Sequence, residues 1–410
     1  MNKPLKGTTA WLPMALKTLM AAETVLVAWK LNLDFPGIVP GSLAAVVLQL
    51  WTCRRRLEPI ITLAIAAGLA VIRFAADMRT LWEHPECFLV FLGLASLLIM
   101  GMSIVSNTSN RMPERLAAFG AAVGINLLVI VAPFVLLYTV RANSVTFDKV
   151  LYAFDGSLRF QPSFVLGRLL NEFRWLGWIS RFAYGQVPIA IALLFASTLY
   201  GSTPRRPNVF LVIAGATLIG SIMYGLFPAA GPAHLFPMRF PDSAPSLIGM
   251  AWLPSVLSND APRNAMPSLH MTWAVLLYWN ARRSALWLRI VYILFLLLTV
   301  LATLGTGEHY LIDLVVALPF ALAVQTAFSI PVGELRRSLP FWAGSTGTLF
   351  WLAFLRFGEP VWLGSAMMDW GLVALTVLGS VIIERQLSRA RYSPAPVSNL
   401  APRFSASENL

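Results

Sequence analysis

Repeated apolar runs, most of them about 16 to 25 residues long, are the feature that most limits how this chain can fold. A helix needs about 20 residues to cross the hydrocarbon core of a bilayer, and a backbone in lipid must satisfy its own hydrogen bonds. The runs lie at 10–30, 37–52, 59–76, 87–106, 116–140, 183–201, 208–228, 266–281, 285–304, 309–329, 338–356 and 362–383. We predict an all-α, polytopic transmembrane helix bundle of about 10–12 spans, with the first two runs the weakest.

The composition supports a bilayer as the solvent. Hydrophobic residues make up 57% of the chain and charged residues 12%, which is about half the charged share of a soluble domain. The net charge of +12 comes from short basic clusters between the apolar runs. A nucleic-acid binder gathers such residues on one soluble face, so we expect no nucleic acid partner. The only two cysteines, Cys53 and Cys87, do not suggest a disulfide framework.

The basic clusters also predict the orientation, because Lys and Arg gather in cytoplasmic loops. If all the apolar runs cross the membrane, nearly all clusters fall on the side of the amino terminus. They are Arg54 to Arg56, Arg111 and Arg115, Arg205 and Arg206, Arg282 and Arg283, Arg336 and Arg337, and Arg385, Arg389 and Arg391. We expect an integral membrane protein of a bacterial inner (cell) membrane, with the opposite loops facing the periplasm or exterior.

One long basic segment, 141–182, falls on the outer side against this rule, which long segments obey poorly. Its second half, 164–182, mixes three arginines with Phe and Trp residues. This mixture suits a helix in the outer membrane interface against anionic headgroups, and a packed surface helix is the equally weighted alternative. The last residues, 386–410, are rich in Ser, Pro, Ala and Arg and predict a disordered cytoplasmic tail.

Three of the four histidines, His234, His270 and His309, lie close together in the sequence and at the same predicted outer face. His270 and His309 each stand where a loop rich in Gly, Pro or Ser leads into an apolar helix. Residues four apart on a helix share a face, so Asp313 is expected to orient the His309 imidazole. His270, on a neighbouring helix start, would transfer the proton in a phosphoryl-transfer reaction that needs no metal and no other cofactor.

Each of these residues has a structural alternative. A histidine or an aspartate near a helix end is more often a cap or an interfacial residue than a catalyst. A purely structural explanation must, however, place three polar residues at one membrane face by coincidence. The combination therefore favours catalysis, and the predicted catalytic residues are His309, His270 and Asp313.

The two motifs resemble those of the type 2 phosphatidic acid phosphatase superfamily. Pro267-Ser-Leu-His270 is similar to its Pro-Ser-Gly-His motif, and His309-Tyr-Leu-Ile-Asp313 is similar to its final His-x-x-x-Asp motif. The resemblance implies that His309 is a nucleophile that forms a phosphohistidine, Asp313 its orienting carboxylate and His270 the general acid.

The resemblance also implies a domain organisation around a six-helix core. Amino-terminal transmembrane helices occupy 1–115 and the catalytic core 116–329, which carries the outer interfacial insertion near 141–182. Two further transmembrane helices at 330–385 and the tail at 386–410 complete the chain.

Departures from the common pattern point to one branch of the superfamily. Leu269 stands in place of the motif Gly, and Ala302 and Thr303 replace the Ser-Arg pair that precedes the last histidine. The first basic motif is not found. The chain is more similar to the inositolphosphotransferase branch, which includes inositol phosphorylceramide synthases. The residues expected to bind phosphate in place of the missing ones are Arg263, Ser268 and Arg239.

The remaining polar candidates carry simpler explanations beside the functional one. Arg239 is alternatively a solvated or headgroup-binding arginine. His234 follows a Pro-rich stretch and is a candidate for lining the site, or else an interfacial histidine. Glu308 is expected to be solvated in its loop. Asp369 lies inside an apolar run, which makes it a functional candidate or one half of a helix–helix pair.

The predicted function is that of an integral membrane phosphotransferase. It would move a phosphoryl or phospho-alcohol headgroup between lipids at the extracytoplasmic face, through a phosphohistidine and independently of metal. The lipid would be a phospholipid, a sphingolipid or a polyprenyl phosphate. A lipid phosphate phosphatase is the alternative within the superfamily, and a proton-coupled transporter with histidine relays is the alternative from another class.

Overall fold

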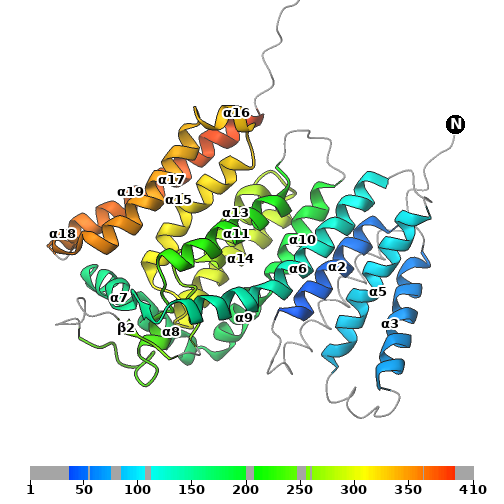
Figure 1. The fold of residues 1–410 in the computed structure, drawn as a ribbon, viewed down its shortest axis with the longest axis horizontal. Helices are drawn as coiled ribbons and strands as arrows, with labels where there is room; N and C mark the ends of the chain where they lie inside the picture. The colour runs from blue at the N-terminus through cyan, green and yellow to red at the C-terminus, as the bar shows by residue number, and fades with distance from the viewer. Residues whose placement is uncertain are drawn as a thin grey trace, which may run out of the picture.

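The computed structural model describes eight stretches of the chain, and within them every long element is an α-helix (Figure 1). The stretches are 37–53, 56–74, 85–106, 112–199, 207–246, 255–258, 261–362 and 364–392. The only strands in these stretches are the two-residue β1 (Val145–Thr146) and β2 (Ser255–Val256), which pair antiparallel. The all-α prediction is confirmed.

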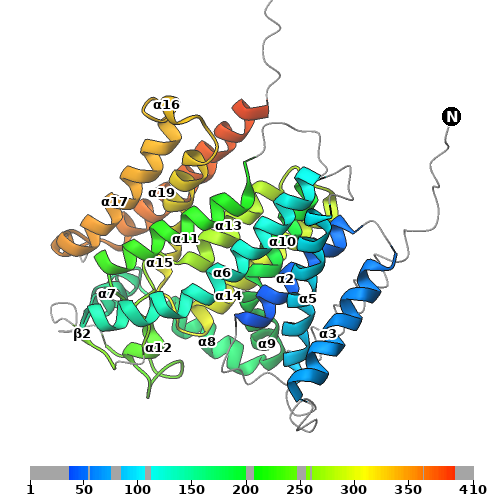
Figure 2. The same cartoon turned by 45° about the vertical axis from the view of Figure 1, so that its right-hand side comes forward.

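Three helices open the described part of the chain and lie side by side (Figures 1 and 2). They are α2 (Ile38–Thr52), α3 (Glu58–Phe74) and α5 (Glu86–Val105), one for each predicted run between 37 and 106. The helices α2 and α5 approach closely, since a Cβ on Gly93 would lie 2.5 Å from the Cβ of Ser42. A 3.0 Å ion pair between Glu58 and Arg115 connects α3 to the helix that follows α5, α6 (Met112–Ala142). The predicted run at 10–30 lies outside the described residues.

Six helices occupy the predicted core region and share its largest cluster of buried apolar side chains. They are α6 (Met112–Ala142), α10 (Val187–Thr198), α11 (Val209–Leu226), α13 (Leu269–Ala281), α14 (Leu286–Gly305) and α15 (Leu311–Ala327). Helix α15 is the most enclosed, because every residue from Ile312 to Thr326 is buried. The carboxylate of Asp313 therefore belongs to the core.

The predicted outer insertion forms three short helices: α7 (Asp148–Ser157), α8 (Pro162–Glu172) and α9 (Arg174–Gly185). Helix α9 packs on α8 and α14 through its small residues Gly177 and Ser180, and it exposes Trp175 and Arg181 on the other side. It continues into α10 through a bend of 59°. One face of α9 is thus packed against protein, and contact of the exposed face with a membrane interface stays a prediction.

The carboxyl-terminal helices cover α15. They are α16 (Val332–Leu335), α17 (Leu339–Phe357), α18 (Glu359–Trp362) and α19 (Ala366–Tyr392). Helix α17 comes close to the backbone of α15, since a Cβ on Gly344 would lie 2.5 Å from the nitrogen of Ala323. Helix α19 continues past residue 386, where the tail was predicted to begin, and the residues 393–410 lie outside the described part.

Five of the described helices are long and apolar enough to cross a bilayer, namely α5, α6, α11, α14 and α19. The bent pair of α9 and α10 makes a sixth if it counts as one span. The predicted total of about 10–12 spans is therefore not confirmed by length and composition. The helices α13 and α15 are shorter than the apolar runs at 266–281 and 309–329, because the first residues of each run form loops.

Helices α13 and α15 carry the motifs at their starts, and α14 runs between them in the opposite direction. Both motif helices therefore begin at the end of the bundle where α14 ends (Figure 2). The basic residues that follow α13 and precede α17 lie toward the other end of the bundle. There Arg282 forms an ion pair with Glu384 near the end of α19 and donates a 3.3 Å hydrogen bond to Ser388. The motif loops and these basic residues thus occupy opposite ends.

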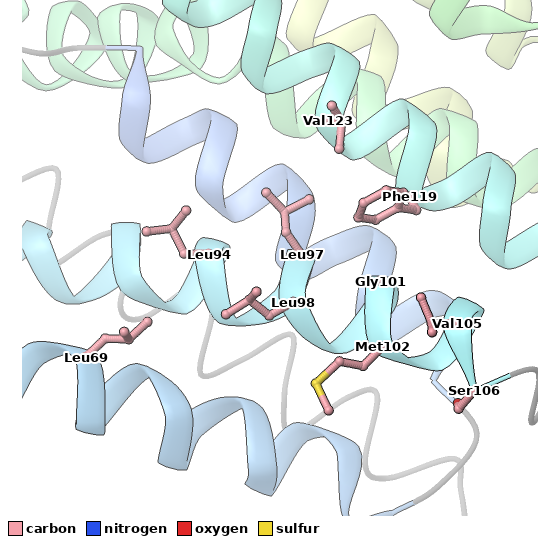
Figure 3. Close-up of a pocket in the computed structure, with 10 residues that line it drawn as sticks. All are labelled: Leu69, Leu94, Leu97, Leu98, Gly101, Met102, Val105, Ser106, Phe119 and Val123. Atoms are coloured by element: carbon pink, nitrogen blue, oxygen red, sulfur yellow. The ribbon is translucent and has the colours of Figure 1, made fainter.

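An apolar groove of about 790 Å³ lies between α3, α5 and α6 (Figure 3). Side chains such as Leu69, Leu98 and Phe119 line it, one from each helix. Its ten lining residues include no histidine and no charged residue. The groove is therefore separate from the predicted chemistry.

Candidate active site

Three loops meet at the end of the bundle where α13 and α15 begin. The first follows α11 and contains α12 (Pro232–Leu235), the second leads into α13, and the third joins α14 to α15. Main-chain hydrogen bonds connect them: Ala265 N donates to Ala229 O at 2.8 Å, and Ala233 N donates to Gly307 O at 3.0 Å. Main-chain hydrogen bonds thus join the three loops that carry the motif residues.

The Pro-rich turn before α12 lies against the third loop, and Gly231 makes this approach possible. Its φ is 105°, which L side chains rarely adopt, and a Cβ here would lie 2.5 Å from the carbonyl of Glu308. From the other side, Asp148 accepts hydrogen bonds from the nitrogens of Gly231, at 2.8 Å, and Ala230, at 3.0 Å. The turn is held on both sides, directly beside the residue that precedes His309.

The His309 side chain is 2% exposed, and its contacts define its tautomer. Its Nδ1 lies 3.0 Å from the carbonyl oxygen of Ala265 and 3.4 Å from Asp313 Oδ2. Both neighbours are acceptors, so Nδ1 carries the proton of the neutral imidazole and Nε2 carries the lone pair. This Nε2 lies 3.2 Å from the Oγ of Ser268, whose hydroxyl can donate to it.

Asp313 meets His309 across the start of α15 rather than along one helix face. His309 lies in the loop, two residues before the helix begins, and Asp313 lies in the first turn. Oδ2 of Asp313 also accepts a 2.8 Å hydrogen bond from the nitrogen of Tyr310, which closes a capping box. The sequence analysis thus expected the pair for a reason that the structure corrects, since the helix cap brings the two residues together.

Ser268 is fully buried and caps α13. Its Oγ accepts a 3.3 Å hydrogen bond from the nitrogen of Met271, and its own nitrogen donates to the carbonyl of Asp313 at 3.3 Å. The same hydroxyl faces Nε2 of His309. Ser268 therefore links the start of α13 to both residues of the second motif.

His270 is the second residue of α13 and lies two residues beyond Ser268. Its ring stacks on Tyr184 of α9, with centroids 3.7 Å apart and an interplanar angle of 20°. Its ring also meets the ring of Trp273 at 5.0 Å and 68°. Tyr184 was not predicted, because α10 and α11 separate its helix from the first motif and nothing in its local sequence marks it.

Arg263 is fully buried, and main-chain carbonyls surround its guanidinium. It donates to the carbonyls of Asn143 (3.3 Å), Leu257 (3.4 Å), Ser258 (3.3 Å) and Ala261. Burial lowers the pKa of Arg263. In this arrangement Arg263 braces the loop that carries Ala265, and its phosphate-binding role stays a prediction.

Arg239 and His234 lie on the outer side of the same loops. Arg239 is exposed in the turn after α12. His234 is partly exposed, and its Nε2 lies 3.7 Å from a carboxylate oxygen of Glu308, which raises the pKa of His234. Glu308 is thus paired with His234, whereas the sequence analysis expected it to be solvated in its loop.

Two buried aspartates of α7 hold the site from outside the motifs, and the sequence analysis missed them. Asp148 accepts a 3.0 Å hydrogen bond from the hydroxyl of Tyr310. Asp155, seven residues later on the same face, accepts hydrogen bonds from the nitrogens of Leu311 (2.7 Å) and Ile312 (3.2 Å) at the start of α15. Burial raises the pKa of both carboxyl groups, and the hydrogen bonds that each group accepts oppose the rise. Their spacing of seven residues, which is two helical turns, was the sequence signal that could have identified them.

The comparison with protein families decides which known proteins this arrangement resembles. Residues 149–327 match the PAP2 superfamily. The PAP2 segment begins in α7, ends with α15 and includes every predicted site residue. The match supports the superfamily, whose members are generally phosphatases or phosphotransferases, and the inositolphosphotransferase branch is not confirmed. No curated protein and no solved structure matches the chain.

Across the stretches that the structure describes, no group of three or more His, Cys, Asp and Glu side chains is arranged to hold a metal ion.

Proposed function

We propose that the protein is a membrane phosphotransferase that takes a phosphoryl or phospho-alcohol group from a lipid, with His309 as the nucleophile. The observation that carries this proposal is the tautomer of His309. Because Nδ1 is directed at two oxygen acceptors, the lone pair is on Nε2, beside the Ser268 hydroxyl. On substrate binding this hydroxyl would turn from Nε2 and donate to a phosphate oxygen, which leaves the Nε2 lone pair to face phosphorus.

In the first step Nε2 of His309 attacks phosphorus, and the bond from phosphorus to the leaving alcohol oxygen breaks. His270 protonates that oxygen. The imidazole of His309 becomes positively charged as it gains the phosphoryl group, and Asp313 together with the Ala265 carbonyl stabilises the Nδ1 proton. In the second step an acceptor hydroxyl attacks the phosphohistidine, gives its proton to His270 and restores His309.

The acceptor decides between transfer and hydrolysis, since both use the same phosphohistidine. The similarity of Pro267-Ser-Leu-His270 to the transferase branch favours an alcohol acceptor. The burial of His309 also supports this, because a nucleophile shielded from water suits an acceptor that fills the site. A lipid phosphate phosphatase is the second candidate, with water as the acceptor.

The site is proposed to face the periplasm or exterior and to work without a metal. The orientation is supported by the basic residues at the opposite end of the bundle, among them Arg282 and Arg336. Labelling tests it in a chain whose two native cysteines are replaced by serine. Asp242→Cys, in an exposed turn on the site side, should react from outside intact cells, and Glu334→Cys, exposed at the other end, should not.

The decisive experiment traps the intermediate. Protein in detergent with EDTA is given ³²P-labelled lipid phosphates and phosphodiesters, and an acid-labile phosphoprotein is measured. The wild type should form it, His309→Ala should not, and His270→Ala should form it slowly. A phosphoprotein in His309→Ala, or loss of activity on chelation, contradicts the proposal. Product analysis with and without an added alcohol then separates transferase from phosphatase.

A further inference from the structure

Two aromatic contacts orient the ring of His270. It stacks on Tyr184 at 3.7 Å and meets the edge of Trp273 at 5.0 Å. Within the described residues no hydrogen bond involves its nitrogens. His309 is held differently, since both of its nitrogens have polar neighbours. The two histidines of the site are therefore fixed by different physical means.

This difference matches what each ring must do. A nucleophile needs one protonated nitrogen and one lone pair, and polar contacts specify which is which. A residue that gives a proton in one step and takes one in the next must change its protonation state twice. A hydrogen bond to either nitrogen would favour one state. An aromatic face restricts the plane of the ring and leaves both nitrogens free.

The position of Tyr184 depends on a rigid part of the fold. It is the penultimate residue of α9, next to Gly185, where the chain bends by 59° into α10. Helix α9 is anchored by Gly177, whose Cβ would lie 2.9 Å from the carbonyl of Leu170 in α8. The bend thus presents one aromatic side chain of the outer insertion to the start of α13.

We propose that Tyr184 is a positioning residue for His270, which holds the imidazole for proton transfer without binding either nitrogen. The inference rests on the proposed function. The hydroxyl is not needed for this role, whereas the flat ring is.

A comparison of leaving groups tests the inference. The rate of phosphohistidine formation is measured with octyl phosphate, which loses an alkoxide and needs an acid, and with 4-nitrophenyl phosphate, which does not. Tyr184→Leu should slow the octyl ester by about tenfold or more and the nitrophenyl ester by less than about twofold. Tyr184→Phe should behave like the wild type with both esters. Equal losses on the two esters, or no loss, would overturn the inference.

The controls separate this inference from the proposed function. Phe182→Leu removes a ring of the same helix that stacks on Trp178 instead of His270, and should leave both rates unchanged. His270→Ala calibrates the assay. If His270→Ala slows the reaction of both esters equally, the proposed role of His270 fails. If His270→Ala slows only the octyl ester but Tyr184→Leu does not show this difference, only the inference about Tyr184 fails. Where Tyr184→Leu does not fold, Tyr184→Met is judged by the same ratio.

Discussion

The Nδ1 atom of His309 lies nearer to the carbonyl oxygen of Ala265, at 3.0 Å, than to the carboxylate of Asp313, at 3.4 Å. Two acceptors therefore share the task of fixing one tautomer. One is a side chain within the second motif, and the other is a main-chain group in the loop before the first motif. The proposed nucleophile thus depends on a contact that no side-chain substitution can delete directly.

Asp313→Asn should lower the rate of phosphohistidine formation without abolishing it. The Ala265 carbonyl still accepts from Nδ1, so we expect a loss of about 10- to 100-fold in phosphohistidine formation. That is less than the about 10⁴-fold loss known where one aspartate alone sets the tautomer of a catalytic histidine. Rapid-quench measurement of the acid-labile phosphoprotein checks this. If the Asp313→Asn variant were as inactive as His309→Ala, the carbonyl would contribute nothing.

Arg263→Lys should act on stability before it acts on substrate affinity. A lysine cannot reach the four carbonyls that the guanidinium contacts, so buried acceptors lose their donors, at a cost of about 1–3 kcal/mol each in the free energy of unfolding. Thermal unfolding in detergent measures the effect. Arg239→Lys, at an exposed position, is the control and should leave the melting temperature unchanged. A raised KM with unchanged stability in Arg263→Lys would instead support the phosphate-binding role.

Ser268→Ala should cost both stability and rate. It removes the cap of α13, worth about 1 kcal/mol, and the hydroxyl next to His309 Nε2. Ser338→Ala removes a similar cap from α17, which carries none of the predicted site residues, and provides the matched control. Equal loss of stability in both variants, with loss of rate only in Ser268→Ala, is the expected result of unfolding and single-turnover measurements.

The pair of His234 and Glu308 should make stability depend on pH. Glu308 raises the pKa of His234 in the folded protein, with Asp148 acting in the same direction and Arg263 against it. The stabilisation is therefore complete below the pKa of an unfolded histidine, about 6.5, and is lost as the pH rises through the higher folded value. Glu308→Gln should lower the melting temperature at about pH 5.5 and have little effect at about pH 9. An effect of the same size at both pH values contradicts the ion pair.

Asp155→Asn should disturb the start of α15, although Asp155 lies outside both motifs. One oxygen of the buried carboxylate becomes an NH₂ group that faces a main-chain N–H, which leaves a donor unpaired at a cost of about 1–3 kcal/mol. We expect a lower melting temperature and slower phosphohistidine formation. Asp242→Asn, in an exposed turn, is the control. Unchanged kinetics in Asp155→Asn would mean that α7 does not position His309.

The sequence predicted the helices and the two motifs because both are local signals. Each described apolar run is largely helical, and His309 lies beside Asp313 as the second motif suggested, whereas the contact of Ser268 with His309 was not predicted. Helix length was less predictable, since Met266 and His309 open apolar runs in the sequence but belong to loops. Among the described residues, five helices, or six with the bent pair, are long and apolar enough to span a bilayer, and the predicted total of about 10–12 spans stays a prediction.

The residues that the sequence missed act through contacts between distant segments. Asp148 and Asp155 bond to main-chain groups more than 80 residues away, and main-chain partners leave no pattern in a sequence. Arg263 was expected at the phosphate because of its charge and its distance from His270. The structure shows that its guanidinium donates to carbonyls that a β-bridge and a loop bring together, which only a folded chain reveals, and its phosphate-binding role stays a prediction.

Helix α15 has almost no side of its own that faces lipid. Helices α17 and α19 form a hairpin that packs against α15 and shields it from lipid. The superfamily match stops where α15 ends, so this hairpin lies outside it. If the chain ended at Ala327, acyl chains would contact a flank of α15 that fits closely against Gly344, so the hairpin supplies the protein surroundings of the helix whose first turn carries Asp313. Substitutions in the hairpin would then alter the surroundings of Asp313 without contacting a substrate.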